Sequence, residues 1–284
     1  MDNFESPHFD PTRPATALGP APAFAPEPPP APWSLRDLFF FLAFSLAALL
    51  IAQFVSLAVY FALKPLAGWH ASVASLAQNP FFLLAFQALF YLLLLGYVFL
   101  LVVTHYHLPF LQGIRWRVPA PGSVLGFLAA GVTLAIAVQF APTVLPDRDQ
   151  FPLQQLFSSA AASYAVGAFA ILIAPFMEEL IFRCVFFNVL EIRVSRGFAI
   201  FTTALLFAAL HVPEYWGAWN HVMLIFLVGM VFSLARGVTG SLVPSVLLHG
   251  AYNASLIIGI FIATQHFKHL EGLLALAART VAGV

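Results

Sequence analysis

The chain has 284 residues, of which 61% are hydrophobic and 8% are charged, and its 12 basic and 12 acidic side chains leave no net charge. Soluble domains carry about 25% charged residues, so this composition excludes an ordinary soluble protein and places the chain in a membrane. The balanced charge excludes an electrostatic nucleic-acid-binding surface, and the single cysteine excludes a disulfide framework and a multi-cysteine metal site.

The N-terminal stretch differs from the rest of the chain. Residues 1–34 are rich in alanine and contain ten prolines. Such a stretch can neither form a helix nor bury a core, so we expect a disordered, partly polyproline tail. The first apolar segment begins only near Leu38 and is too long for a cleaved signal peptide, which predicts a retained first span. Residues 35–284 are then the membrane-embedded domain.

Seven apolar segments follow the tail and predict an all-α, polytopic transmembrane helix bundle with seven spans. Five reach the length of about 17–25 residues that a span needs, whereas the fifth and the sixth are short. Residues 270–284 are too few for a full span, so they either lie at the membrane interface or form a short eighth helix. The seven segments are 38–63, 80–104, 122–144, 163–190, 198–211, 221–235 and 241–263.

The basic residues outside the spans predict the orientation. An N-terminus in the cytoplasm places seven of them on the inner side and four on the outer side, which favours this topology. The chain shows no eukaryotic targeting signal, which favours a bacterial plasma membrane. The inner residues are Arg13, Arg36, Arg115, Arg117, Arg193, Arg196 and Arg236, and the outer ones are Lys64, Arg148, Lys268 and Arg279.

The fourth segment contains charged side chains in the run "APFMEELIFRCVFF", residues 174–187. Each charge would cost about 2.5–3.5 kcal/mol in hydrocarbon, so something must offset or use it. Glu179 and Arg183 are four residues apart on one helix face, which predicts a buried ion pair. Glu178 points about 100° away and has no such local partner, which leaves it available for chemistry. The alternative is a purely structural ion cluster.

Three other polar residues lie at a similar depth. Counted from the inner ends of their helices, Glu178 lies about 18 Å deep, His211 about 20 Å and His249 about 12 Å, all near the middle of the bilayer. Asn253 follows His249 by four residues and shares its face. We therefore expect these four side chains to surround one polar site. Taken singly, His211 would be an interfacial residue, His249 a core histidine and Asn253 a contact between helices.

These residue types suit hydrolysis. A carboxylate can take a proton from water, an imidazole can hold that water, and histidine and asparagine can stabilise an oxyanion. Glu178, His211 and His249 would also provide three ligands for a catalytic Zn²⁺, the cofactor that the sequence suggests if the site is metal-dependent. The HExxH pattern of zincin proteases does not occur.

Three motifs resemble those of a known family. "EELIFR" (178–183), "FAALH" (207–211) and "HGAYN" (249–253) are similar to the EExxxR, FxxxH and HxxxN motifs of the CPBP family, intramembrane proteases of the CAAX-prenyl-endopeptidase or Abi type. The resemblance covers about residues 160–265. It implies Glu178 as general base, His211 holding the water, His249 and Asn253 binding the oxyanion, and Glu179 and Arg183 as supporting residues.

The same resemblance implies a prenylated CAAX-like tail or another membrane-associated peptide or protein as substrate, and it leaves metal dependence open. A bacterial chain would make a prenylated substrate less suitable. The partners expected are membrane lipid and this substrate, without nucleic acid. Two alternatives are a non-proteolytic self-immunity or scaffold protein and a transporter that uses Glu178 as proton carrier. The intact motifs favour the enzyme, and the lack of internal repeats disfavours the transporter.

Overall fold

A computed structural model describes residues 33–67, 72–140 and 156–270. Over these ranges the regular structure is helical, without a strand, which confirms the all-α prediction. Six helices are long and apolar enough to cross a membrane, and the chain is an integral membrane protein. The predicted tail before Trp33 and the C-terminal segment beyond Leu270 lie outside the described ranges.

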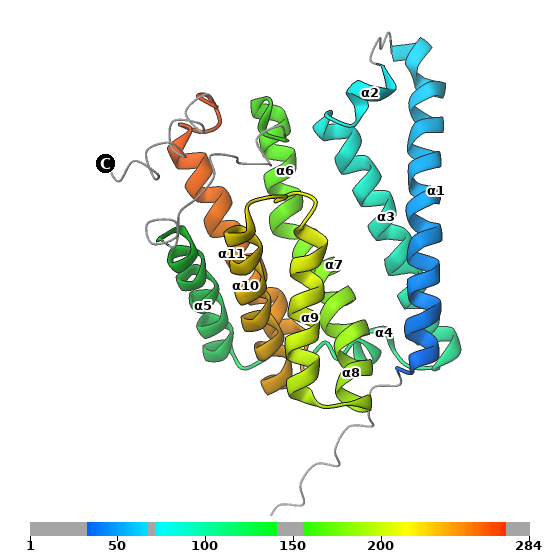
Figure 1. Cartoon of the computed structure of the whole chain (residues 1–284), viewed down its shortest axis with the longest axis vertical. Helices are drawn as coiled ribbons and strands as arrows, with labels where there is room; N and C mark the ends of the chain where they lie inside the picture. The colour runs from blue at the N-terminus through cyan, green and yellow to red at the C-terminus, as the bar shows by residue number, and fades with distance from the viewer. Residues whose placement is uncertain (1–32, 68–71, 141–155, 271–284) are drawn as a thin grey trace, which may run out of the picture. The chain divides into compact units, whose positions relative to one another are not determined.

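When the shorter α9 is included, successive long helices run in opposite directions (Figure 1). Short helices α2 (Val73–Leu76) and α4 (Phe110–Gly113) lie in the connections. The long helices are α1 (Leu35–Ala67), α3 (Pro80–Leu100) with the π-helical turn η1 (Leu101–His105), α5 (Pro121–Phe140), the interrupted span Ala160–Arg193, α10 (Trp219–Thr239) and α11 (Val243–Ala263).

Within the described ranges, six helices are long enough to span a membrane, rather than the seven spans expected. The fifth predicted segment forms α9 (Arg196–His211), whose 16 residues leave it shorter than the others. The sixth predicted segment is longer than expected, because α10 extends over the polar residues at both of its ends and reaches 21 residues. Gly240 ends α10 with a φ of 65°, in the left-handed region that glycine adopts most readily.

The span that carries the first motif is built from four consecutive pieces, α6 (Ala160–Leu172), α7 (Ala174–Glu179), the π-helical η4 (Leu180–Phe186) and α8 (Phe187–Arg193). Pro175 lacks an N–H and its ring clashes with the preceding turn, which accounts for the break between α6 and α7. In η4 the backbone bonds run from i to i+5, a geometry that frequently occurs at functional sites. The two glutamates therefore end α7, and the arginine lies in the π-helical piece.

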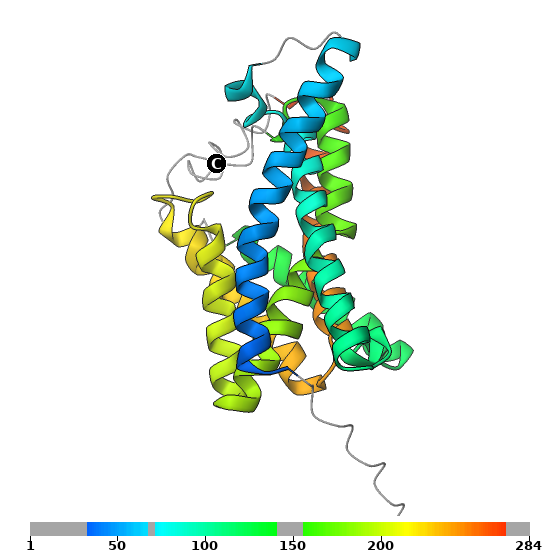
Figure 2. The ribbon, with the colours of Figure 1, turned by 90° about the vertical axis from the view of Figure 1, so that its right-hand side faces the viewer.

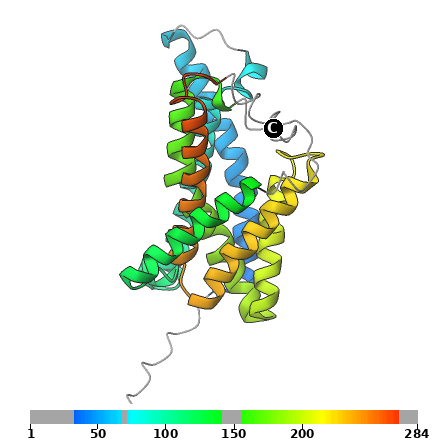
Figure 3. The same ribbon diagram turned by 90° about the vertical axis from the view of Figure 1, so that its left-hand side faces the viewer.

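Two glycines let helices of the bundle approach closely. A Cβ on Gly131 of α5 would lie 2.3 Å from the Leu248 carbonyl oxygen of α11, and Figure 3 shows these two helices crossing. A Cβ on Gly229 of α10 would lie 3.3 Å from the Cα of Ala204 on α9. Small residues are typical of such contacts in membranes, where van der Waals packing drives association. The backbone next to His249 is thus positioned by α5.

Polar contacts tie the helices together at one end. Helix α1 packs along α3, so the first turn of α1 lies beside the end of α3 (Figure 2). There the hydroxyl of Tyr106, which follows η1, donates to the buried Asp37 of α1. Burial and this hydrogen bond raise the pKa of Tyr106 well above its usual range, so the hydroxyl stays a donor. In the α10–α11 connection, the Ser241 hydroxyl donates to the Arg117 carbonyl at 2.8 Å. The loop before α5 is thereby fixed to the start of α11.

The close approach of α5 and α11 makes Gly131 sensitive to substitution. Gly131→Ala should destabilise the folded protein by about 1–3 kcal/mol, because the added methyl group would overlap the Leu248 carbonyl. Gly126→Ala on the same helix is the control, since its added Cβ has nothing within 4 Å. Thermal unfolding in detergent measures both variants. Equal melting temperatures would contradict the close contact.

Candidate active site

The predicted ion pair is present at the centre of the bundle. Arg183 Nη1 lies 3.1 Å from Glu179 Oε1, and neither side chain has any solvent exposure. Arg183 also donates from Nη2 to the Gly229 carbonyl at 2.9 Å and from Nε to the Ser233 hydroxyl at 3.3 Å. The guanidinium therefore links the motif-bearing span to α10, and the prediction of a buried Glu179–Arg183 pair is confirmed.

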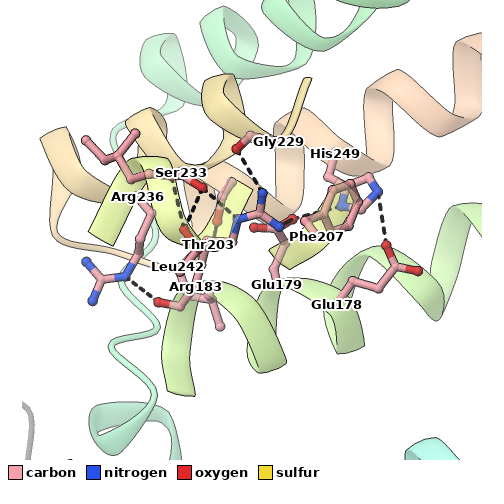
Figure 4. Close-up of polar contacts among 12 residues, drawn as sticks. Glu178, Glu179, Arg183, Thr203, Phe207, Gly229, Ser233, Arg236, Leu242 and His249 are labelled. Atoms are coloured by element: carbon pink, nitrogen blue, oxygen red, sulfur yellow. Dashed lines mark hydrogen bonds and ion pairs between the residues drawn. The ribbon is translucent and has the colours of Figure 1, made fainter. Parts of the chain in front are cut away.

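His249 lies between the two glutamates (Figure 4). Its Nδ1 is 2.9 Å from Glu179 Oε1, and its Nε2 is 3.6 Å from Glu178 Oε2. The ring stacks on Phe232, with ring centroids 4.4 Å apart. An ionised carboxylate can only accept, so Nδ1 carries a proton toward Glu179 and Nε2 is left facing Glu178. The imidazole is thus oriented by its neighbours, with Nδ1 as the donor to Glu179.

The two adjacent glutamates have different surroundings. The Glu179 side chain is completely buried, whereas that of Glu178 is 21% exposed. Glu178 has no partner on its own helix, as expected, but it is held by two other helices. Tyr91 of α3 donates to Glu178 Oε1 at 3.3 Å, and His249 of α11 faces Oε2. Glu178 is therefore positioned and partly accessible, while Glu179 is enclosed.

His211 and Asn253, the other two predicted site residues, are bonded to backbone carbonyls. His211 Nδ1 lies 2.8 Å from the Phe207 carbonyl oxygen, and because a carbonyl accepts, Nδ1 is the protonated nitrogen. Asn253 Nδ2 donates to the Ala170 carbonyl on α6 at 2.8 Å. Within the described part of the chain, neither residue forms a hydrogen bond or ion pair with Glu178. The structure thus places Glu178 next to His249. The roles predicted for His211 and Asn253 stay predictions.

Residues 160–255 match the family model described as type II CAAX prenyl endopeptidase Rce1-like. This segment is an Rce1-like domain of the CPBP family. The match begins at α6 and ends within α11 just beyond Asn253, so it contains all three motifs and agrees with the range expected from the sequence. Searches of curated proteins and of solved structures found no match.

The Rce1-like domain brings two of the three predicted metal ligands, Glu178 and His249, close together. Among the residues that the structure describes, no group of three histidine, cysteine, aspartate or glutamate side chains is arranged to hold a metal ion. Glu178 and His249 are close enough to share one, but His211 Nδ1 is engaged with the Phe207 carbonyl. The side chains as they stand do not fit a three-residue site, and no step is derived through a metal. The metal alternative stays a prediction for elemental analysis.

The connection between α9 and α10, residues 212–218, adds a carboxylate next to the Rce1-like site. Glu214 is exposed at the surface, yet the surrounding residues remove part of its hydration. This partial desolvation raises the pKa of Glu214, the His211 side chain lowers it, and the Glu178 carboxylate raises it further. Glu214 is therefore close enough to His211 and Glu178 to interact with both electrostatically.

Arg236 was assigned from the sequence to the inner end of α10, but the structure buries it. The side chain is 1% exposed, donates from Nε to the Arg183 carbonyl at 3.0 Å, and donates from Nη2 to Asn188 Oδ1 at 2.5 Å. Its Nη1 is buried without a hydrogen-bond partner among the described residues. A chain of buried polar groups therefore runs from Arg236 through Arg183 and Glu179 to His249 (Figure 4).

Sequence reasoning missed the partners that come from other helices. Tyr91, Ser233 and the Gly229 carbonyl bind the charged residues of the Rce1-like site, and none belongs to the three motifs. A weak signal exists for Tyr91, because Gln87 and Tyr91 are polar residues four apart on one face of an otherwise apolar segment. Ser233 offers no comparable signal, since a lone serine in an apolar helix is common.

The buried ion pair predicts a large effect of Arg183→Ala. This substitution leaves Glu179 buried without its main partner, and breaking such a pair typically costs about 3–5 kcal/mol. Arg196→Ala is the matched control, because Arg196 is 62% exposed in its pair with Glu191 and should contribute less than about 1 kcal/mol. Yield and thermal unfolding in detergent measure both. Similar stabilities for the two variants would contradict the buried pair.

Proposed function

We propose that the Rce1-like domain is an intramembrane endopeptidase that hydrolyses a membrane-associated peptide or protein. The pairing of Glu178 with His249 carries this proposal, because the two side chains come within 3.6 Å and Glu178 keeps an accessible face. Both residues belong to the segment that matches the endopeptidase family. A partly exposed carboxylate beside a fixed imidazole is suited to general-base hydrolysis.

Glu178 is assigned as the general base. It takes a proton from a water molecule while the water oxygen attacks the carbonyl carbon of the scissile peptide, which gives a tetrahedral oxyanion. The C–N bond then breaks, and the proton held by Glu178 passes to the leaving amine. The two products together contain the atoms of the peptide and of one water molecule, so no further reactant is needed. Glu179 is less suited to this role because it is enclosed and paired.

The remaining roles follow from the free hydrogen-bonding groups. His211 uses Nδ1 on the Phe207 carbonyl, so its Nε2 is an acceptor that can hold the attacking water. Asn253 uses one amide hydrogen on the Ala170 carbonyl and has a second for the oxyanion. The imidazolium form of His249 would offer an Nε2–H to the same oxyanion. It would also balance the cluster, since two carboxylates would then face one guanidinium and one imidazolium.

The substrate is proposed from the setting of the site. The family description names CAAX prenyl endopeptidases, and a prenyl group is apolar. The Rce1-like site lies among long apolar helices, so a substrate must reach it from the bilayer or its surface. We assign the substrate class as membrane-associated peptides in general, with a prenylated tail as one member. We also propose that the protein resides in a bacterial plasma membrane.

The topology is proposed to place the N-terminus in the cytoplasm, with α9 as a seventh, shorter crossing. Alternating helix directions support this proposal, because they put the start of α1 and the connections before α5, α9 and α11 at the same end of the helices (Figure 1). The basic residues Arg115, Arg117, Arg193 and Arg196 all occur in or next to these connections. An excess of Lys and Arg marks the cytoplasmic side of membrane proteins.

Cysteine labelling tests this topology. In a Cys184→Ala background, Val194→Cys should react with a membrane-impermeant maleimide only after the membrane is opened, because the α8–α9 corner faces the cytoplasm. Trp216→Cys in the α9–α10 loop should react in intact spheroplasts. Both replaced side chains are well exposed, at 60% and 76%. The reverse pattern would contradict the orientation, and reaction of both from one side would contradict a crossing by α9.

Glu178→Gln tests the proposed function. The amide keeps the size of the side chain but cannot take a proton, so hydrolysis should fall by about 10²–10⁴-fold, the usual contribution of a general base. The measurement is cleavage of a membrane-embedded reporter peptide by the purified protein. Glu191→Gln, which changes a carboxylate in the exposed pair with Arg196, is the control.

Elemental analysis of the same samples separates the two forms of the proposal. Unchanged metal content in Glu178→Gln supports the general base, whereas parallel loss of metal and activity, repeated in His211→Ala and His249→Ala, supports a metal ligand. Full activity in Glu178→Gln would overturn both forms. Absence of cleavage by the parent protein would make the non-proteolytic scaffold or self-immunity protein the better assignment.

A further inference from the structure

Helix α3 contributes a residue to the site from outside the family match. Tyr91 is 7% exposed, and its hydroxyl donates to Glu178 Oε1 at 3.3 Å. The matched segment begins only at residue 160, so this contact joins the Rce1-like domain to the N-terminal part of the chain. No motif of the domain supplies an equivalent donor to Oε1 among the described residues.

The Tyr91 side chain is held on several sides. Its ring stacks on Phe169 of α6, with centroids 5.9 Å apart and an angle of 13° between the rings. Gln87, one turn earlier on α3, also interacts with the hydroxyl. Stacked, buried rings have little rotational freedom, so the position of the phenol oxygen is set by the packing of α3 on α6. The hydroxyl is therefore a fixed donor rather than a chance contact.

The two oxygens of Glu178 have separate neighbours. Oε1 accepts from Tyr91, and Oε2 is 3.6 Å from His249 Nε2, a distance beyond an ordinary hydrogen bond. A donor on Oε1 fixes the orientation of the carboxylate. Oε2 then remains as the oxygen that can accept a proton. The geometry thus distinguishes an anchored oxygen from a reacting one.

We propose that Tyr91 is a positioning residue for Glu178, and this inference rests on the proposed function of Glu178 as general base. The phenol holds Oε1 and turns Oε2 toward His249 and the attacking water. Tyr91 acts through Glu178 and does not itself exchange a proton with the substrate. The catalytic apparatus of this chain accordingly extends beyond the three family motifs to α3.

Tyr91→Phe tests the proposal, because it removes the hydroxyl and keeps the stacked ring. We expect kcat to fall by about 10- to 100-fold, the range for one hydrogen bond to a charged group, with KM unchanged. Without the donor the carboxylate is no longer held in its working orientation, so the loss should fall on kcat and leave KM unchanged. A merely structural role would lower the yield of folded protein and leave kcat per folded molecule unchanged.

Tyr97→Phe is the matched control on the same helix. Its ring stacks on Phe44 at 4.6 Å, and its hydroxyl forms no hydrogen bond within the described residues. The control should retain the parent kcat and KM. Tyr91→Phe with the same kcat as Tyr97→Phe would overturn the positioning role while leaving the proposed function intact.

Infrared spectroscopy tests the contact independently of activity. The carboxylate band that disappears in Glu178→Gln should shift in Tyr91→Phe and stay in place in Tyr97→Phe. An unshifted band would overturn the hydrogen bond whatever the kinetics show. Parent protein that binds but does not cleave the reporter peptide would overturn the proposed function and, with it, the positioning role. The two failures are therefore distinguishable.

Discussion

The buried ion pair between Glu179 and Arg183 is the interaction on which the geometry of the site depends. Two fully enclosed charges are tolerated only when their other hydrogen-bonding groups also find partners, because each has lost its hydration. Arg183 meets this condition through Glu179, Ser233 and the Gly229 carbonyl. The guanidinium thus fixes the motif-bearing span against α10. It also holds Glu179 in place, and the Glu179 oxygen that accepts from Arg183 in turn orients the imidazole of His249.

Adjacent glutamates can take different roles because a helix turns about 100° per residue. Glu179 points into the bundle, where it accepts from Arg183 and His249 through one oxygen. The Glu178 side chain is 21% exposed, and it contacts Tyr91 of α3 and His249 of α11. Pairs of ionisable groups in contrasting environments are the usual way in which one site separates a structural charge from a reactive one. The contrast here arises because Glu178 and Glu179 are adjacent in sequence, lie on different faces of the helix and therefore meet different neighbouring groups.

The sequence predicted those features that depend on spacing within one helix. The four-residue interval between Glu179 and Arg183 is such a feature, and the pair is present. Contacts between helices could not be predicted, because the crossing of α3 or α10 over the motif-bearing span depends on packing. Tyr91 and the burial of Arg236 were missed for this reason. The length of α10 was underestimated because its polar ends read as connections. The proximity of Glu178 and His249 was predicted only from their similar depths in the membrane, and similar depth does not by itself specify a contact.

The N-terminal helices take part in the site although the family match begins at residue 160. Helix α5 packs against α11 at Gly131, where the contacted carbonyl belongs to Leu248, the residue before His249. A larger residue at position 131 would displace α11. Helix α3 reaches Glu178 through Tyr91. The motifs thus provide the reactive groups, whereas two helices outside the match limit where those groups can lie. Since a general base must be held within a fraction of an ångström of its working geometry, helices that carry no motif can still determine whether the motifs function.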